Sequence, residues 1–393
     1  MHSKPVLLRS IRKWDLVAVA INSVIGAGIF GLPSKVFELA GVYSLAAFVL
    51  CGLLAAMIVL CFAEVGSRFS DTGGPYLYAR EAFGPTVGFT MGWLMWIARV
   101  TAFAANTSVL LAYLSLFWPS LQAEPVRSAA ICGITLLVGG VNFIGVRDVT
   151  LTTNILTVAK MAPLLALIVV GCFTLDPANF ALTAPPEAAK FSSAMLLLVY
   201  AFTGFEMATI PGGEIRDPRR DLPSAILTAI AIVVFIYILI QVVCIGTVPG
   251  LATSDRPLGD AASRVLGGWG AVIITIGAAL SIAANLNVVV LAASRLPFAM
   301  AVRGELPGVL GSVHKQFLTP HVSIILTAAI MGIVTLSGTF LYAVTVSTIA
   351  RLLIYATTCG ALPVLRGREG APAAFRAPMG TLVAMGVIGL VAW

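Results

Sequence analysis

Eleven apolar runs, each long enough to form a membrane-spanning helix, follow one another along the 393 residues of this chain. An α-helix needs about 20 apolar residues to cross the ~30 Å hydrocarbon core of a bilayer. Only 10% of the residues are charged, whereas soluble domains carry about 25%. We therefore expect an all-α polytopic membrane protein, with residues 1–393 forming a single transmembrane domain. The expected spans are 14–37, 42–67, 86–117, 127–145, 150–173, 192–211, 224–248, 270–298, 321–337, 340–365 and 378–393.

Lysine and arginine are distributed unevenly among the segments between these runs. If the N-terminus is cytoplasmic, sixteen of the 24 basic residues lie on the cytoplasmic side and five on the other side. Basic residues favour cytoplasmic loops, so we expect a cytoplasmic N-terminus in the cell (plasma or inner) membrane. This bias also explains the net charge of +7, which therefore does not call for a nucleic-acid partner.

The sequence lacks the motifs of an enzyme or a primary pump. No HExxH, GxGD or phosphate-binding P-loop motif occurs, and no histidine in a span has another at helical spacing. The six cysteines all fall in apolar runs without paired spacing, which favours packing over disulfides or metal ligation. We therefore expect neither an enzyme nor a bound cofactor or metal.

The first apolar run is interrupted at a place where interruption is costly. Its stretch INSVIGAGIFGLP (21–33) contains three glycines and a proline within eight residues. In a helix interior, glycine costs about 1 kcal/mol and proline about 3 kcal/mol, and a freed backbone group in lipid has no water to bond. The pattern predicts a break near Gly26, Ala27 and Gly28.

The sixth run has a break candidate of the same kind, at Thr203-Gly204, followed by Glu206 and Pro211. Interrupted spans in corresponding positions of two five-span halves, here 14–173 and 192–365, are typical of inverted-repeat transporters whose site lies at the breaks. The alternative is that the glycines only allow close helix packing.

Broken helices present free backbone groups at the middle of a membrane. A half-helix that begins there points N–H groups at an anion, and one that ends there points carbonyl groups at a cation. A zwitterion, which carries a carboxylate and an ammonium group, matches both ends. The breaks therefore predict a site for an amino acid.

Five motifs, in this order, resemble the amino acid–polyamine–organocation (APC) family of transporters. They are GAGIFGLP, GGPYLYAREAFG, FTGFE, RDPRRDLP and ARLLIYATTCGALPVLR, and the resemblance runs from about residue 14 to residue 366. It implies the LeuT-like fold, a five-plus-five inverted repeat with broken spans 1 and 6, usually followed by two peripheral spans. Only one such span, 378–393, is predicted here. It reaches Trp393 without a polar flank, which leaves open a missing twelfth span.

The resemblance also implies the contacts of the substrate. Its carboxylate would meet the backbone of Gly26, Ala27 and Gly28, and its ammonium would meet carbonyls near Val24, Tyr200 and Thr203, beside Gly204. Tyr200 aligns with the aromatic gate of the family. The side-chain pocket would draw on Ala102, Phe103 and Asn285, which favours neutral amino acids and leaves cationic ones open. Phe202 and Phe205 are assigned to packing.

Lys160 lies ten residues into span 5, too deep to snorkel easily to an interface. Sodium-coupled relatives of the fold hold a cation between spans 1, 5 and 8, and family members with this lysine are taken to be sodium-independent and proton-coupled. Burial of a lysine makes loss of its proton near neutral pH physically possible. The alternative is a permanently charged lysine bound to carbonyls of span 1. Ser281 in span 8 is a candidate partner.

Glu206, Arg99 and Arg351 also lie within spans, where a charge is rare and has a partner. Glu206 follows the second break, and we consider two roles for it: titration during transport, or a fixed anchor of the unwound segment. Arg99 and Arg351 are expected to pair with acids or carbonyls in the bundle.

We therefore expect a secondary active amino acid permease, a symporter for protons that does not need sodium and works by alternating access. Its partners are a small amino acid, protons and the lipid bilayer. The alternatives are a transporter of polyamines or other organic amines, which lack a carboxylate, and an amino acid exchanger.

Overall fold

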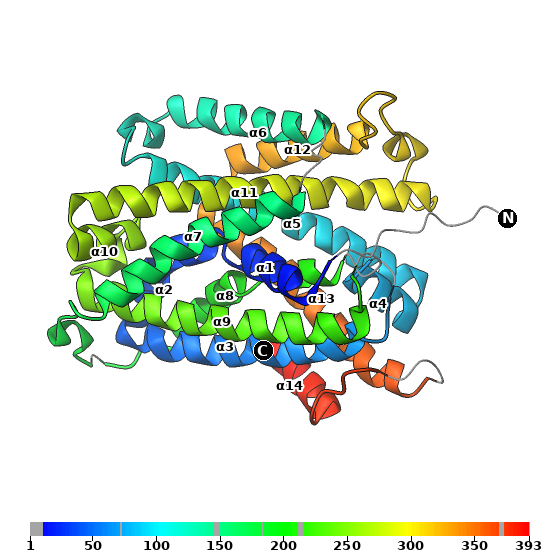
Figure 1. Cartoon of the computed structure of the whole chain (residues 1–393), viewed down its shortest axis with the longest axis horizontal. Helices are drawn as coiled ribbons and strands as arrows, with labels where there is room; N and C mark the ends of the chain where they lie inside the picture. The colour runs from blue at the N-terminus through cyan, green and yellow to red at the C-terminus, as the bar shows by residue number, and fades with distance from the viewer. Residues whose placement is uncertain are drawn as a thin grey trace.

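The computed structural model describes residues 11–70, 73–144, 149–182, 184–210, 215–368 and 373–392. These residues form a bundle of helices, most of them aligned with the long axis of the molecule (Figure 1). Within them there is no strand, and one isolated bridge joins Ile11 to Ile215. The helices are α1 (Lys13–Val24), α2 (Ala27–Ala40), α3 (Ser44–Gly66), α4 (Pro75–Phe83), α5 (Pro85–Leu114), α6 (Val126–Ile144), α7 (Val149–Gly171), α8 (Ala188–Ala201), α9 (Pro218–Thr247), α10 (Pro257–Leu266), α11 (Gly268–Val302), α12 (His321–Ser337), α13 (Phe340–Arg366) and α14 (Gly380–Ala392).

The prediction of an all-α polytopic membrane protein is confirmed. Seven helical segments of the described residues are long and apolar enough to cross a membrane, and three shorter helical segments are also apolar. Each of the eleven predicted runs coincides with described helix, and the first is divided between α1 and α2. Two short helices, α4 and α10, lie outside the predicted spans, because their mixed polar and apolar residues do not form an apolar run.

The core of the bundle is built around α5, which packs against both α11 and α13. On one side of this core, α1 and α3 pack against α9, and α2 packs against α8. On the other side α6 and α12 pack against each other, at the top of Figure 1. Neither α1, with 12 residues, nor α2, with 14, is long enough to cross a bilayer alone, so both end inside the bundle.

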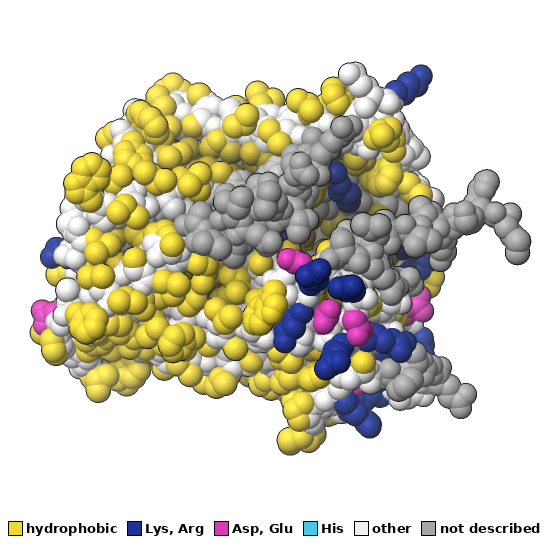
Figure 2. Space-filling view, in the orientation of Figure 1, with side chains coloured by type: hydrophobic (Ala, Val, Ile, Leu, Met, Phe, Trp, Pro, Cys, Tyr) yellow, Lys and Arg dark blue, Asp and Glu magenta, His cyan; other side chains and the backbone are white. Residues whose placement is uncertain are grey.

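Basic side chains gather at the end of the molecule where α4 lies (Figures 1 and 2). Arg216, Arg219 and Arg220 are exposed at the start of α9. Hydrophobic side chains cover most of the rest of the face shown in Figure 2. An apolar belt with charge concentrated at one end is the surface expected of a membrane protein.

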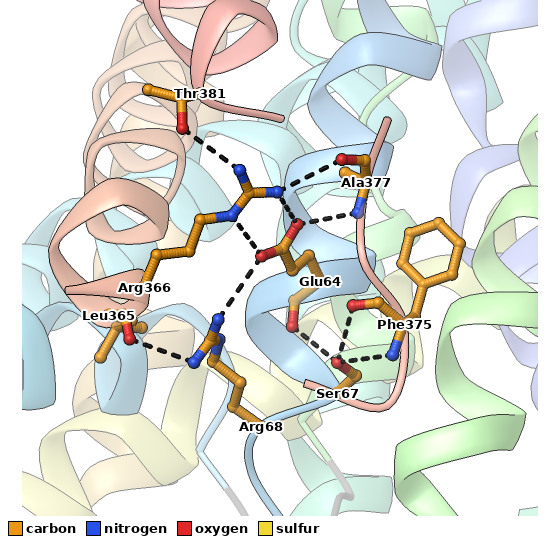
Figure 3. A network of polar contacts seen from close by, with 8 residues as sticks. All are labelled: Glu64, Ser67, Arg68, Leu365, Arg366, Phe375, Ala377 and Thr381. Atoms are coloured by element: carbon orange, nitrogen blue, oxygen red, sulfur yellow. Dashed lines mark hydrogen bonds and ion pairs between the residues drawn. The ribbon is translucent and has the colours of Figure 1, made fainter. Parts of the chain in front are cut away.

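A buried acid fastens the segment before α14 to the core (Figure 3). Glu64, near the C-terminal end of α3, is fully buried and receives two hydrogen bonds from Arg366 of α13, of 2.7 and 2.6 Å. Arg68 lies 3.5 Å from the same carboxylate, and the amide of Ala377 donates to it at 2.8 Å. Bidentate arginine–carboxylate pairs are among the stronger polar contacts, so Glu64 joins α3, α13 and the segment that leads to α14.

Candidate functional site

The first predicted break is present and lies between α1 and α2. Helix α1 ends at Val24 and α2 begins at Ala27, so only Ile25 and Gly26 are outside regular helix. The prediction of non-helical backbone at residues 26–28 was therefore wrong for Ala27 and Gly28, which form the first turn of α2. Amides in a first helical turn have no partner within their helix, so these residues still present N–H groups.

The second break is also present, between α8 and the 3₁₀ helix η4 (Phe205–Thr209). Gly204 adopts a left-handed conformation with φ +118°, and a Cβ atom there would lie 2.3 Å from the carbonyl oxygen of Ser23. A Cβ atom at Gly28 would lie 2.8 Å from the Cα atom of Ala201. The two broken spans thus touch each other, as expected. Pro211, the end of the predicted sixth span, lies outside the described residues.

A central cavity of about 30 Å³ lies between the two breaks. This is the space of about one water molecule, so the site is contracted in this conformation. All seven residues predicted to bind substrate line it: Val24, Gly26, Ala27, Gly28, Tyr200, Thr203 and Gly204. Ala102 and Asn285 also line the cavity, whereas Phe103 does not and is fully buried.

A side-chain amide occupies the amide end of the cavity. Asn106 of α5 accepts a hydrogen bond of 3.1 Å from the amide of Ala27, and its own NH₂ group donates to Asn285 at 3.0 Å. Its oxygen thus stands where a carboxylate oxygen of a substrate was predicted. Asn106 was not among the residues predicted from the sequence, although an asparagine inside an apolar run is itself a signal of a functional position.

The carbonyl groups at the other end of the cavity already accept hydrogen bonds from the protein itself, which was not predicted. The Val24 carbonyl accepts from the amide of Gly26 at 2.8 Å and from the hydroxyl of Tyr237 at 3.2 Å. The Tyr200 carbonyl accepts from the amide and the hydroxyl of Thr203, at 3.2 and 2.7 Å. Since a carbonyl oxygen has two lone pairs, neither Val24 nor Tyr200 has a free one in this conformation.

Lys160 braces the first break from α7. Its ammonium, in a side chain only 2% exposed, donates to the carbonyls of Asn22 at 2.8 Å and Ile25 at 2.9 Å, and also to the side-chain oxygen of Asn22. Ser281 is not a direct partner of Lys160: it donates to the same Ile25 carbonyl, at 3.4 Å. A cation at the C-terminal end of a helix such as α1 is favourable. Asn22 was also missed from the sequence.

Glu206 holds the second break. Its carboxylate accepts from the amide of Gly204 at 2.8 Å, from Tyr355 at 2.9 Å and from Arg351 at 2.5 Å, and lies 3.6 Å from Arg99. These contacts favour the anchor over the titrating group. They also agree with the expectation that both buried arginines pair with an acid.

The chain matches the family model "Amino acid permease" over residues 11–393. It belongs to the amino acid permease family. It is 29% identical to the methylthioribose transporter of Bacillus subtilis (strain 168), over 98% of this chain and 88% of that protein. It is 29% identical to the serine/threonine exchanger SteT of the same organism, over 78% and 72%. It is 30% identical to the large neutral amino acids transporter small subunit 2 of Oryctolagus cuniculus, over 79% and 61%.

Two aromatic residues of the permease beside the second break serve packing, as predicted. The ring of Phe202 lies 5.2 Å from that of Tyr237, and the ring of Phe205 lies 5.2 Å from that of Phe62. Neither phenylalanine lines the central cavity. These edge-to-face and tilted contacts hold the unwound segment against α3 and α9.

A second cavity of about 320 Å³ lies one turn farther along α2 and α5 of the permease. Gly31 and Val109 line it, where Ala27 and Asn106 line the central cavity. Gly31 is closely packed against its neighbours, because a Cβ atom there would lie 2.9 Å from Val109 and 3.3 Å from Phe340. This second cavity is large enough for an amino acid.

Proposed function

We propose that this permease is a secondary active transporter of α-amino acids that binds its substrate between the two breaks. The proposed architecture is the LeuT-like inverted repeat of residues 14–173 and 192–365, with a cytoplasmic N-terminus in the cell membrane. The observation that carries the proposal is that amides of α2 and carbonyls of α1 and α8 meet at one cavity. Alternating access would open this cavity to each side in turn.

The α-carboxylate of the substrate would take the place now held by the side chain of Asn106. The amide of Ala27 donates to a neutral oxygen here, and a carboxylate would form a stronger, charge-assisted bond. The start of α2 adds the positive end of its helix dipole. The α-ammonium would bind carbonyls at the opposite wall, either by displacing the donors of Val24 and Tyr200 or through Ser23 and Thr203, which line the same wall.

Lys160 would provide the coupling to protons and make sodium unnecessary. Its ammonium contacts α1 and the Ile25 carbonyl that Ser281 of α11 also contacts, so it occupies a cation position between spans 1, 5 and 8. If α1 moves away during transport, the ammonium loses its acceptors while still buried. That is the condition under which a lysine releases its proton.

The charges around the central cavity argue against a polyamine as substrate. Arg99 and Arg351 both line the cavity, and Glu206 is the only acid that contacts them among the described residues. Two guanidinium groups against one carboxylate leave one excess positive charge, which repels a polycation and attracts a carboxylate. This also weighs against cationic amino acids, which the sequence had left open.

Competition between substrate analogues tests the proposal. Esterified or decarboxylated analogues should compete with the parent amino acid about tenfold less well or worse, because a buried donor loses a charged partner. A decarboxylated amine that competes equally would establish the polyamine alternative.

Exchange is the second candidate, since one relative is named a serine/threonine exchanger. Uptake that requires amino acid on the opposite side, at any proton gradient, would establish exchange.

A further inference from the structure

Arg99 is a buried cation at the wall of the central cavity, and its guanidinium makes no hydrogen bond with the described residues. Its side chain is 6% exposed and lines part of the cavity. Its one polar contact with the described residues is the ion pair with Glu206, at 3.6 Å, which is beyond hydrogen-bond distance. A guanidinium carries five N–H donors, so the described residues leave most of the hydrogen-bonding capacity of Arg99 unused.

Glu206 supplies only part of the acceptor capacity that Arg99 needs. The Oε1 atom of Glu206 already accepts from Arg351 at 2.5 Å, and its Oε2 atom accepts from the amide of Gly204 and the hydroxyl of Tyr355. Glu206 is therefore largely committed to Arg351 and to the break. The excess positive charge of this cluster remains with Arg99, which faces the space that a substrate would enter.

The position of Arg99 along α5 fits a role in reading the substrate side chain. Arg99, Ala102 and Asn106 all line the cavity, because their spacing of three and four residues places them on one helix face. Asn106 marks the end where the α-carboxylate would bind. Arg99 lies seven residues away, which is roughly 10 Å along the helix axis. An amino acid held at Asn106 would extend its side chain past Ala102 toward the guanidinium.

We propose that Arg99 selects α-amino acids whose side chain ends in a carboxylate. This inference rests on the proposed function and names the substrate class of the same site. A side-chain carboxylate would satisfy the planar guanidinium through two parallel hydrogen bonds. It would also neutralise the excess charge that Arg99, Arg351 and Glu206 leave at the cavity. A substrate of this class replaces the neutral amino acids that the sequence favoured.

The test compares acidic amino acids with their amides, which have nearly the same size and differ in charge. In proteoliposomes with the full chain, labelled glutamate and aspartate should be taken up with a KM about tenfold or more below those of glutamine and asparagine. Arg99→Gln should raise the KM of the acids by about tenfold or more and leave that of the amides nearly unchanged. Arg99→Lys should give an intermediate result, because an ammonium cannot bind in bidentate fashion.

Arg295→Gln is the matched control. Arg295 is a partly buried arginine of α11 that bonds only Leu291 and Ser294 among the described residues, and it does not line the cavity. This variant should keep the wild-type preference for acidic amino acids over their amides.

Equal KM values for acids and amides in the wild type would overturn the inference even if no variant folds. If a folded Arg99→Gln protein loses uptake of acids and of amides to the same extent, the inference is also overturned. Arg99 would then serve only as a structural counter-ion of Glu206. In both cases amino acids are still transported, so the proposed function stands. Absence of any amino acid uptake by the folded wild type would instead refute the proposed function, and this inference with it.

Discussion

The ammonium nitrogen of Lys160 lies 2.9 Å from the carbonyl oxygen of Ile25, the residue at which the first span stops being helical. The carbonyl of Asn22 accepts from the same ammonium at 2.8 Å, so the last turn of α1 is capped from α7. A lysine with three donors and three oxygen acceptors is fully satisfied here. The break is therefore stabilised by a buried cation, and the proton release that we propose for Lys160 would weaken these hydrogen bonds.

Replacement of Lys160 tests this link. Lys160→Ala should abolish gradient-driven uptake, because the end of α1 loses its brace and the site loses its cation. Lys160→Arg should bind substrate without accumulating it, because arginine keeps its charge at any physiological pH. Binding is measured by equilibrium dialysis and accumulation by uptake under an inward proton gradient. Proton-driven accumulation by Lys160→Arg would leave the lysine as a brace and remove it as the proton carrier.

Gly204→Ala should destabilise the permease through the contact between the two breaks. The new Cβ atom would lie 2.3 Å from the Ser23 carbonyl oxygen in a backbone with φ +118°. The matched control is Gly304→Ala, at φ +77°, where no atom lies within 4 Å of the new Cβ. Gly304→Ala adds only the backbone strain, about 1–2 kcal/mol, and Gly204→Ala should cost about 1–3 kcal/mol more. Equal losses of stability on chemical denaturation in detergent would contradict the close approach.

Asn106→Asp should weaken substrate binding more than Asn106→Ala does. An aspartate would place a permanent carboxylate on the amide of Ala27 and compete with the substrate, whereas alanine frees the amide for it. We expect the KM to rise by about tenfold or more in the aspartate variant. If alanine is the more harmful substitution, Asn106 contributes a contact to the substrate and does not stand in for its carboxylate.

Glu64→Ala should loosen the segment that leads to α14. Arg366 and the amide of Ala377 would lose their acceptor, and we expect a loss of roughly 1–3 kcal/mol of stability, together with faster proteolysis after α13. The control is Glu187→Ala, which breaks an exposed pair with Lys190 at 3.7 Å and should have no measurable effect. Unchanged proteolysis in Glu64→Ala would show that the packing of α14 holds this segment in place without the Glu64 contacts.

The sequence predicts the fold and the breaks because both depend on local features. Span length follows from apolar runs, and the breaks follow from glycines and prolines whose helix cost is large. The first break was placed one or two residues late, because glycines at 26 and 28 mark the region without showing which of them starts α2.

The contacts that cross between helices could not be predicted from one sequence. Nothing local to Asn106 or Asn22 shows that one meets the amide of Ala27 and the other meets Lys160. The charges of Arg99 and Arg351 were evident in the sequence, but their place at the cavity depends on how α5 and α13 rotate in the bundle. Hence the backbone part of the site was predictable, and the part that distinguishes side chains was not.

Proton-coupled amino acid transport is tested by uptake of a panel of labelled amino acids into proteoliposomes, with and without an inward proton gradient and in the absence of sodium. We expect an α-amino acid to accumulate without sodium, only while the gradient is present, and an excess of its decarboxylated amine not to block this uptake. Uptake that needs sodium, that does not depend on the proton gradient, or that the amine blocks as well as the amino acid does, would refute proton-coupled amino acid transport.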